Sequence, residues 1–171
     1  MVLQIIAKLT RGETILPADS TKDKRIDIDS ESDMVDAENI ENNASTQHLE
    51  APVNVIYQTA EDGLGDTIKP RLLAAGADCT KVMVIDDSEQ PLTMADVRLE
   101  EAIVQTKARM VVLDPIQGFL GSEVDMHRAN EIRPLMKRIA VLAEKYHCAI
   151  ILIGHMNKNS NGKSSYRGLG S

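Results

Sequence analysis

The residues best placed to do chemistry in this sequence are carboxylates that directly follow apolar segments. The clearest case is R-M-V-V-L-D-P, in which four apolar residues lead into Asp114. A carboxylate at the tip of a buried strand can hold a hydrated Mg²⁺ ion that faces nucleotide phosphates. Asp in this position also commonly forms a turn or caps a helix, so this motif by itself leaves both interpretations open.

Two further carboxylates, Glu61 and Asp62, follow the apolar segment that ends at Thr59. If that segment is a strand beside the one that ends at Asp114, one of these carboxylates lies close enough to orient an attacking water molecule. Asp62 is also a candidate for contact with a bound cofactor. The alternative is that Glu61-Asp62-Gly63 forms only a solvated turn.

Polar and basic residues near the C-terminus form a second group of candidates. His155 follows the apolar segment C-A-I-I-L-I-G and can sense a γ-phosphate through a hydrogen bond, or simply cap the strand end. Lys158, Lys163 and Arg167 lie in a polar, Gly/Ser-rich tail, either as solvated charges or as cations supplied to phosphate. The other histidines lack the spacing with Cys or carboxylates that a zinc site needs.

These candidates must be positioned by the elements on which they lie. After Pro52, apolar segments of strand length alternate with segments of helical pattern. The apolar segments are continuous, which indicates burial on both faces and therefore a parallel sheet with right-handed crossovers, of fold class α/β. Ligand sites in such sheets lie beyond the carboxyl ends of the strands. We predict neighbouring parallel strands at residues 53–58, 81–85, 109–114 and 148–154, and helices at residues 65–77, 95–107 and 125–147.

The N-terminal part departs from this pattern. Residues 1–11 carry apolar side chains around most of a helix, so we predict a buried helix there. Residues 18–50 are acidic, polar and without aromatic side chains, which is typical of a disordered insertion, with room for a short helix near residues 34–40. We therefore expect one partial domain over residues 1–171 that this insertion interrupts.

Composition limits the classes of function. Of the 171 residues, 19 are basic and 26 are acidic, a net charge of -7, so any contact with a polyanion must be local. The two cysteines, Cys79 and Cys148, and the lack of a signal-like segment fit a cytoplasmic protein with reduced thiols. The longest apolar run, residues 148–154, is far shorter than the roughly 18–20 residues that cross a membrane, which argues against a membrane role.

Taken together, the motifs resemble a known family. They are Y-Q-T-A-E-D with a following R-L-L-A-A-G-A-D, then M-V-V-L-D-P-I-Q-G-F, I-L-I-G-H-M-N-K and Y-R-G-L-G-S. These look like the RecA-like ATPases related to the plasmid replicative helicase RepA and to phage or prophage AAA-family proteins. The resemblance covers residues 1–12 and 51–171. It implies a three-layer RecA-like domain that hydrolyses ATP with Mg²⁺ in a homo-oligomeric ring and acts on DNA, single-stranded DNA in particular.

The resemblance also implies a role for each candidate. Asp114 matches the Walker B aspartate, which would bind the magnesium ion, and Glu61 matches the catalytic glutamate. His155 matches the sensor position. Lys158 and Arg167 resemble the cations that reach a neighbouring subunit's nucleotide in the ring.

One part of the family's pattern is missing. The Walker A signature G-x-x-x-x-G-K-[ST] is absent from the 171 residues, and V-L-Q-I-I-A-K-L-T-R-G-E resembles the helix that follows it. Without that loop, the backbone N–H cradle for the phosphates is missing. We therefore expect a domain trimmed at both ends and inactive as an isolated chain. Two alternatives stay open: a non-catalytic module that pairs with an intact paralogue, and a magnesium-dependent α/β hydrolase built on Asp86, Asp87 and Asp114.

Overall fold

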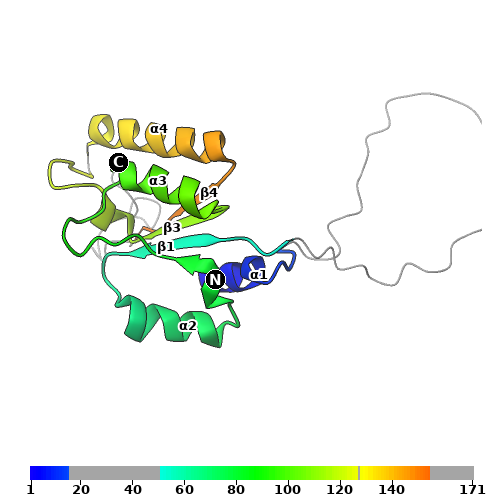
Figure 1. The fold of residues 1–171 in the computed structure, drawn as a ribbon. Coiled ribbons are helices and arrows are strands. Elements are labelled where there is room, and N and C mark those ends of the chain that lie inside the picture. The colour runs from blue at the N-terminus through cyan, green and yellow to red at the C-terminus, as the bar shows by residue number, and fades with distance from the viewer. Residues whose placement is uncertain (16–50, 127, 155–171) are drawn as a thin grey trace, which may run out of the picture.

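The computed structural model describes residues 1–15, 51–126 and 128–154 (Figure 1). Its strands are β1 (Val55–Thr59), β2 (Val82–Met83), β3 (Met110–Asp114) and β4 (Ala149–Leu152). Its helices are α1 (Val2–Thr10), α2 (Lys69–Ala74), α3 (Val97–Thr106) and α4 (Ala129–Tyr146). Three shorter helical segments are η2 (Leu64–Ile68), η3 (Cys79–Lys81) and η4 (Ile116–Phe119). The insertion predicted at residues 18–50 lies outside the described residues.

The four strands form one parallel sheet in the order β2-β1-β3-β4. The inner strands β1 and β3 pair along their whole length, from Val55 opposite Met110 to Thr59 opposite Asp114. The first four residues of each inner strand are buried, as the continuous apolar segments predict, whereas β2 and most of β4 are half-buried. The predicted α/β fold class and the parallel sheet are confirmed.

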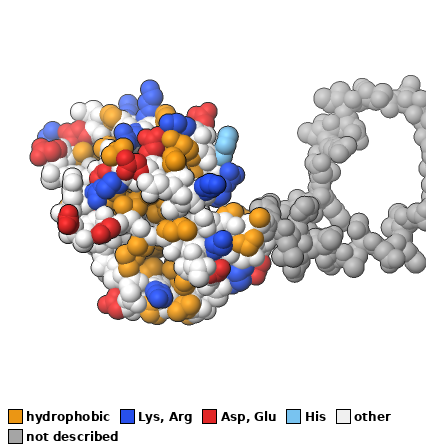
Figure 2. All heavy atoms as spheres, in the orientation of Figure 1, with side chains coloured by type: hydrophobic (Ala, Val, Ile, Leu, Met, Phe, Trp, Pro, Cys, Tyr) orange, Lys and Arg blue, Asp and Glu red, His pale blue; other side chains and the backbone are white. Residues whose placement is uncertain are grey.

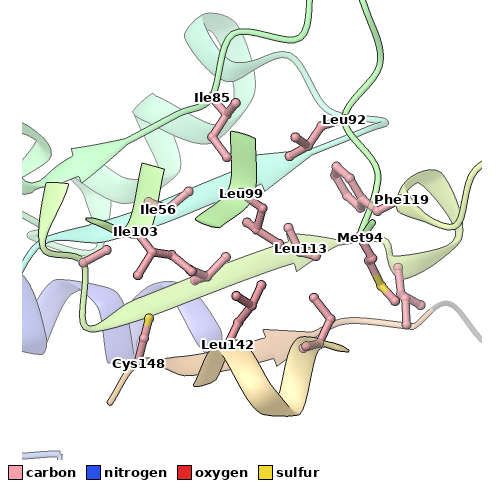
Figure 3. Packing of buried hydrophobic residues seen from close by; sticks show 14 of the residues in the cluster. Ile56, Ile85, Leu92, Met94, Leu99, Ile103, Leu113, Phe119, Leu142 and Cys148 are labelled. Atoms are coloured by element: carbon pink, nitrogen blue, oxygen red, sulfur yellow. The ribbon is translucent and has the colours of Figure 1, made fainter. Parts of the chain in front are cut away.

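Helices cover both faces of this sheet, which gives three layers. In Figure 1, α3 and α4 lie on one side of the strands and α1 and α2 on the other. Successive side chains of a strand point to opposite faces. The buried residues accordingly form two clusters: Ile56, Val111 and Leu113 pack with α3 and α4 (Figure 3), while Val55, Tyr57, Met110 and Val112 pack with α1 and α2.

All four strands are shorter than predicted, β1 and β3 by one residue and β2 and β4 by three. The strand expected at residues 81–85 ends at Met83, because a side chain replaces the backbone ladder beyond it. The buried Gln58 Oε1 accepts from the Ile85 N–H (3.0 Å), and Gln58 Nε2 donates to the Ile85 carbonyl (3.1 Å). The strand expected at residues 148–154 spans only Ala149–Leu152.

The helix predictions are confirmed in position but not in every boundary. The helix expected at residues 65–77 is the π-helical η2 followed by α2, and the chain turns away at Gly76, which has a φ of 80°. The helix expected from residue 125 begins at Ala129, after Arg128 with extended backbone. The expected N-terminal helix is α1, which is buried on one side only, through Ile6, Ala7 and Thr10. Among the described residues, no helix has the length and apolar character to cross a membrane.

Candidate functional site

The carboxyl ends of β1 and β3 bring the predicted acidic residues together. Thr59 and Asp114 are register partners, and the Ala60 N–H donates to the Asp114 carbonyl (3.1 Å). Glu61 and Asp62 come directly after Ala60, whose backbone is bonded to the last residue of β3. The prediction that Glu61 and Asp114 lie at the same edge of the sheet, on neighbouring strands, is confirmed.

Asp114 is held by a residue that the sequence interpretation did not single out. The Tyr57 hydroxyl donates to Asp114 Oδ2 (2.8 Å). Tyr57 is 2% exposed and lies among the residues that face α1 and α2. Burial, together with the Asp114 carboxylate, raises the pKa of Tyr57, so the phenol stays protonated and can donate. The signal was present in the spacing, since Tyr57 and Thr59 share one face of β1 and Thr59 is the register partner of Asp114.

The segment after β1, residues 60–63, is a turn as well as part of the site, and we call it the β1 loop. The Thr59 hydroxyl accepts from the backbone N–H of Asp62 (3.1 Å) and of Glu61 (3.4 Å). Asp62 Oδ2 also pairs with Arg71 Nη1 of α2 at 3.1 Å, and these side chains are 46% and 58% exposed. The solvated-turn interpretation and the site interpretation are therefore compatible, because the turn itself presents Glu61 and Asp62 beside Asp114.

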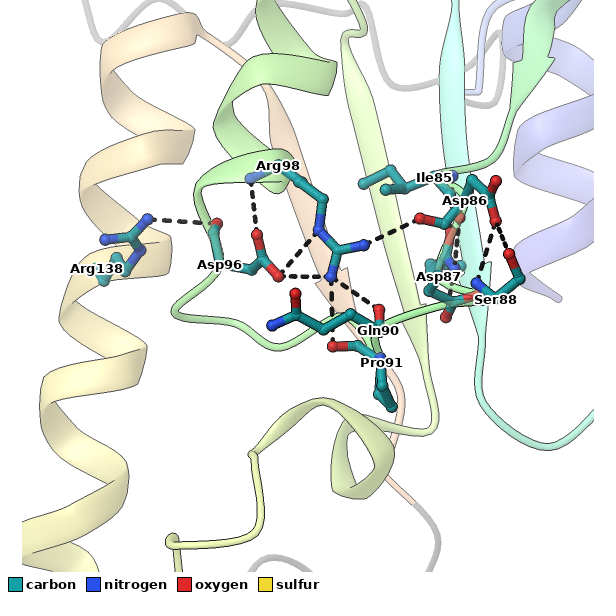
Figure 4. A network of polar contacts seen from close by, with 10 residues as sticks. Ile85, Asp86, Asp87, Ser88, Gln90, Pro91, Asp96, Arg98 and Arg138 are labelled. Atoms are coloured by element: carbon teal, nitrogen blue, oxygen red, sulfur yellow. Dashed lines mark hydrogen bonds and ion pairs between the residues drawn. The ribbon is translucent and has the colours of Figure 1, made fainter.

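The segment after β2, residues 84–96, is held differently, and we call it the β2 loop (Figure 4). Asp86 Oδ1 accepts from the backbone N–H (3.1 Å) and the hydroxyl (2.7 Å) of Ser88, and these bonds lower the pKa of Asp86. Asp87 Oδ2 accepts from Gln58 Nε2 (3.0 Å). Asp86 thus closes a turn within the β2 loop and Asp87 ties this loop to β1, which gives no support to a metal site that they share with Asp114.

The donor atoms near Asp114 fit one kind of cofactor better than another. In the part of the chain that the structure describes, no three His, Cys, Asp or Glu side chains gather as a metal cage. Asp114, Glu61 and Asp62 are hard oxygen donors at one edge of the sheet. Mg²⁺ prefers such donors, and it is usually held by one or two carboxylates together with waters and substrate phosphates. These residues therefore fit a magnesium–nucleotide complex rather than an all-protein metal centre.

A cavity of about 410 Å³ lies beside this site, between α2 and the strands β1 and β2. Its lining is mainly apolar and includes Leu64, Ile68, Leu72 and Val82, together with Tyr57. Neither Asp114 nor Glu61 lines it. The cavity is therefore distinct from the acidic edge, and Tyr57 is a residue that belongs to both.

Three predicted site residues cannot be placed. His155, Lys158 and Arg167 lie outside the described residues, which end at residue 154. Among the described residues, the cation beside the β1 loop is Arg71, through its pair with Asp62. Sequence reasoning did not select Arg71, because only the fold brings α2 to the end of β1.

Comparison with known protein families gives a match. A family model described as an AAA domain matches residues 38–161. The match includes all four strands, the β1 loop, Asp114, His155 and Lys158, and it leaves α1 and Arg167 outside. No curated protein matches the chain.

Proposed function

This chain belongs to the AAA domain family, and from that premise we propose that it is the magnesium-dependent, ATP-hydrolysing part of a protein of DNA replication or recombination. The observation that carries this proposal is the register of the inner strands, which sets Glu61 beside the end of the strand that carries Asp114. An AAA domain implies nucleotide binding, usually with Mg²⁺.

Each described residue of the edge has a proposed task. Asp114 would hold the magnesium ion, and the Tyr57 hydroxyl fixes one oxygen of that carboxylate. A magnesium ion held there would supply positive charge to offset the negative charge that develops on the phosphates. Glu61 orients the attacking water and accepts its proton. Asp62 is held by Arg71 at the rim and contacts the bound cofactor.

The remaining tasks belong to residues outside the described part of the chain. We propose His155 as the sensor of the γ-phosphate and Lys158 and Arg167 as cations that reach the nucleotide of a neighbouring subunit in a homo-oligomeric ring. A cation supplied by a neighbour would make hydrolysis depend on assembly.

The phosphate cradle is the missing part of this proposal. The 171 residues contain no G-x-x-x-x-G-K-[ST] signature, so we propose that the cradle is supplied from outside them. Positioning and charge neutralisation carry most of phosphoryl-transfer catalysis. The chain by itself should therefore bind ATP weakly and not hydrolyse it above background.

DNA is the proposed macromolecular partner, single-stranded DNA in particular, through a local site. With a net charge of -7, the whole surface does not attract a polyanion. On the face shown in Figure 2, basic and acidic side chains are interspersed. This distribution supports a local contact, such as one formed when subunits assemble, over a broad basic surface.

The test compares the 171-residue chain with a loop-bearing form, in which the same chain is preceded by a strand and a G-x-x-x-x-G-K-T loop. Binding of a fluorescent ATP analogue and release of phosphate are measured for both. We expect binding and turnover only in the loop-bearing form, with turnover lost in its Glu61→Gln and Arg167→Ala variants. Robust turnover by the 171-residue chain, or unchanged turnover in both variants, would contradict the assignment. A loop-bearing form that assembles but never binds ATP would favour the non-catalytic module.

A further inference from the structure

Two segments at the carboxyl edge touch each other through very small residues. A Cβ atom placed on Gly118 of η4 would lie 2.3 Å from the Cβ of Ala60 in the β1 loop. Real Cβ atoms do not approach other atoms that closely, so any side chain at position 118 requires a shift. Gly118 does not have the positive φ that Gly121 has, at 91°. Space, and not backbone conformation, therefore makes glycine necessary at this position.

The two segments differ in how firmly they are held. η4 is tied at its start, where the Ile116 N–H donates to the Ile153 carbonyl (2.7 Å), and at its end, where the Phe119 carbonyl accepts from the Met94 N–H (2.7 Å). Ile116 and Phe119 are 0% and 1% exposed, so η4 cannot move without disturbing the core (Figure 3).

The opposing β1 loop is more exposed than η4 and can shift more easily. Ala60, Glu61 and Asp62 are all exposed. Ala60 is held by its N–H bond to the Asp114 carbonyl, and the next two residues by bonds to the Thr59 hydroxyl. A methyl group at position 118 would therefore displace Ala60, and Glu61 with it, rather than η4.

We infer that Gly118 is a positioning residue: its missing side chain lets Ala60 pack against η4 and so sets the place of Glu61 relative to Asp114. The inference rests on the proposed function, because only there do Glu61 and Asp114 act on one substrate. Ala60 is held from two directions, by Asp114 through its N–H and by Gly118 through close packing. Gly118 acts through Ala60 and Glu61 and has no direct part in the chemistry.

The first arm of the test uses the 171-residue chain with Gly118→Ala, Ala60→Gly and both changes together. Backbone amide shifts of Glu61 and Asp62 are measured by NMR. We expect Gly118→Ala to move these amides and the double variant to return them toward the wild-type positions, because Ala60→Gly removes the atom that the new methyl would strike. Unchanged amides in Gly118→Ala, or no return in the double variant, would overturn the inference.

The second arm measures turnover and ATP affinity in the loop-bearing form. A misplacement of about 1 Å can cost roughly a hundredfold in rate, so we expect Gly118→Ala to lower turnover by at least about tenfold with little change in affinity. The double variant should recover most of the loss. The matched control is Gly65→Ala, since an added Cβ at Gly65 meets nothing within 4 Å.

The two arms separate this inference from the proposed function. If the loop-bearing form binds no nucleotide, the proposed function is wrong, while the amide shifts still show whether Gly118 sets the place of Glu61. If the loop-bearing form hydrolyses ATP but Gly118→Ala behaves like Gly65→Ala, or Ala60→Gly does not restore it, the positioning role of Gly118 is wrong and the function stands.

Discussion

The β1 loop and the β2 loop both follow apolar strand segments and both carry paired acidic residues, yet the structure holds them in different ways. The carboxylates of the β2 loop are engaged within the loop and its neighbours, Asp86 with Ser88 and Asp87 with Gln58. The β1 loop instead stands exposed beside Asp114, and its turn is closed through the Thr59 hydroxyl.

A single arginine holds the backbone of the β2 loop in addition (Figure 4). Arg98, near the start of α3, donates to the carbonyls of Asp86 (3.0 Å) and Gln90 (2.9 Å) and pairs with Asp96 at 2.7 Å. The β2 loop is thereby fixed to α3. The carboxylates of Asp86 and Asp87 thus help to hold the β2 loop, whereas Glu61 and Asp62 lie exposed at the edge of the sheet where β3 ends at Asp114.

The largest expected effect is on turnover, which should differ between a change at Asp114 and the same change in the β2 loop. In the loop-bearing form, Asp114→Asn should lower turnover by roughly a hundredfold or more, because electrostatic stabilisation by a metal ion is worth several kcal/mol of barrier. Asp87→Asn makes the same change in the β2 loop and should leave turnover within about twofold, because this carboxylate holds its loop and does not act on the nucleotide. A loss of about 1.36 kcal/mol of transition-state stabilisation would already lower the rate tenfold. Equal losses in both variants would show that the β2 loop also belongs to the site.

A smaller effect is expected from the hydroxyl that holds Asp114. Tyr57→Phe removes one hydrogen bond to a carboxylate, a net loss of about 1–2 kcal/mol, so the Mg²⁺ concentration for half-maximal nucleotide binding should rise by roughly five- to thirtyfold. The control is Tyr146→Phe, which removes a hydroxyl bonded to Glu100 (2.6 Å) far from the β1 loop in sequence. If both variants need the same Mg²⁺ concentration as the wild type, Tyr57 does not position Asp114.

The contacts of Arg98 with the β2 loop predict a difference in stability. Arg98→Ala should lower the melting temperature of the 171-residue chain by several degrees, because the backbone carbonyls of Asp86, Gln90 and Pro91 lose a donor and the Asp96 carboxylate loses its ion pair. Arg71→Ala, which breaks the exposed pair with Asp62, should change it little, since surface ion pairs contribute about 0–1 kcal/mol. Thermal unfolding followed by circular dichroism measures both, and a larger drop for Arg71→Ala would reverse the comparison.

The smallest effect is a pH dependence of the ion pair between Arg98 and Asp96. The hydrogen bonds from Arg98 lower the pKa of Asp96 below its ordinary 3.8, so its stabilising contribution is present above that pH and is lost as the pH falls through the lowered value. Asp96→Asn keeps a good N-cap residue for α3 and removes only the charge. Its melting temperature should lie below that of the wild type at neutral pH, and the gap should narrow below about pH 4. A gap that stays constant into strong acid would argue against this ion pair.

Much of the fold follows from the sequence. Continuous apolar segments predicted buried parallel strands, and the carboxyl-edge rule placed Glu61 and Asp114 together. The boundaries were less readable. The strand expected at residues 81–85 stops at Met83 because Gln58, a residue distant in sequence, bonds to Ile85. The roles assigned to His155, Lys158 and Arg167 stay predictions.

The sequence by itself determined the alternation of strands and helices, the acidic character of the strand ends and the absence of a phosphate-loop signature, because each depends on residue type and local spacing. Only the tertiary structure decided which carboxylates lie at the same edge of the sheet. Tyr57 reaches Asp114 because β1 and β3 pair in one register, Arg98 engages the β2 loop because α3 begins beside it, and Gly118 meets Ala60 because two edge loops converge. Tyr57 and Asp114, like Gly118 and Ala60, are distant in sequence, and the pairing of β1 with β3 and the packing of η4 against the β1 loop bring them together.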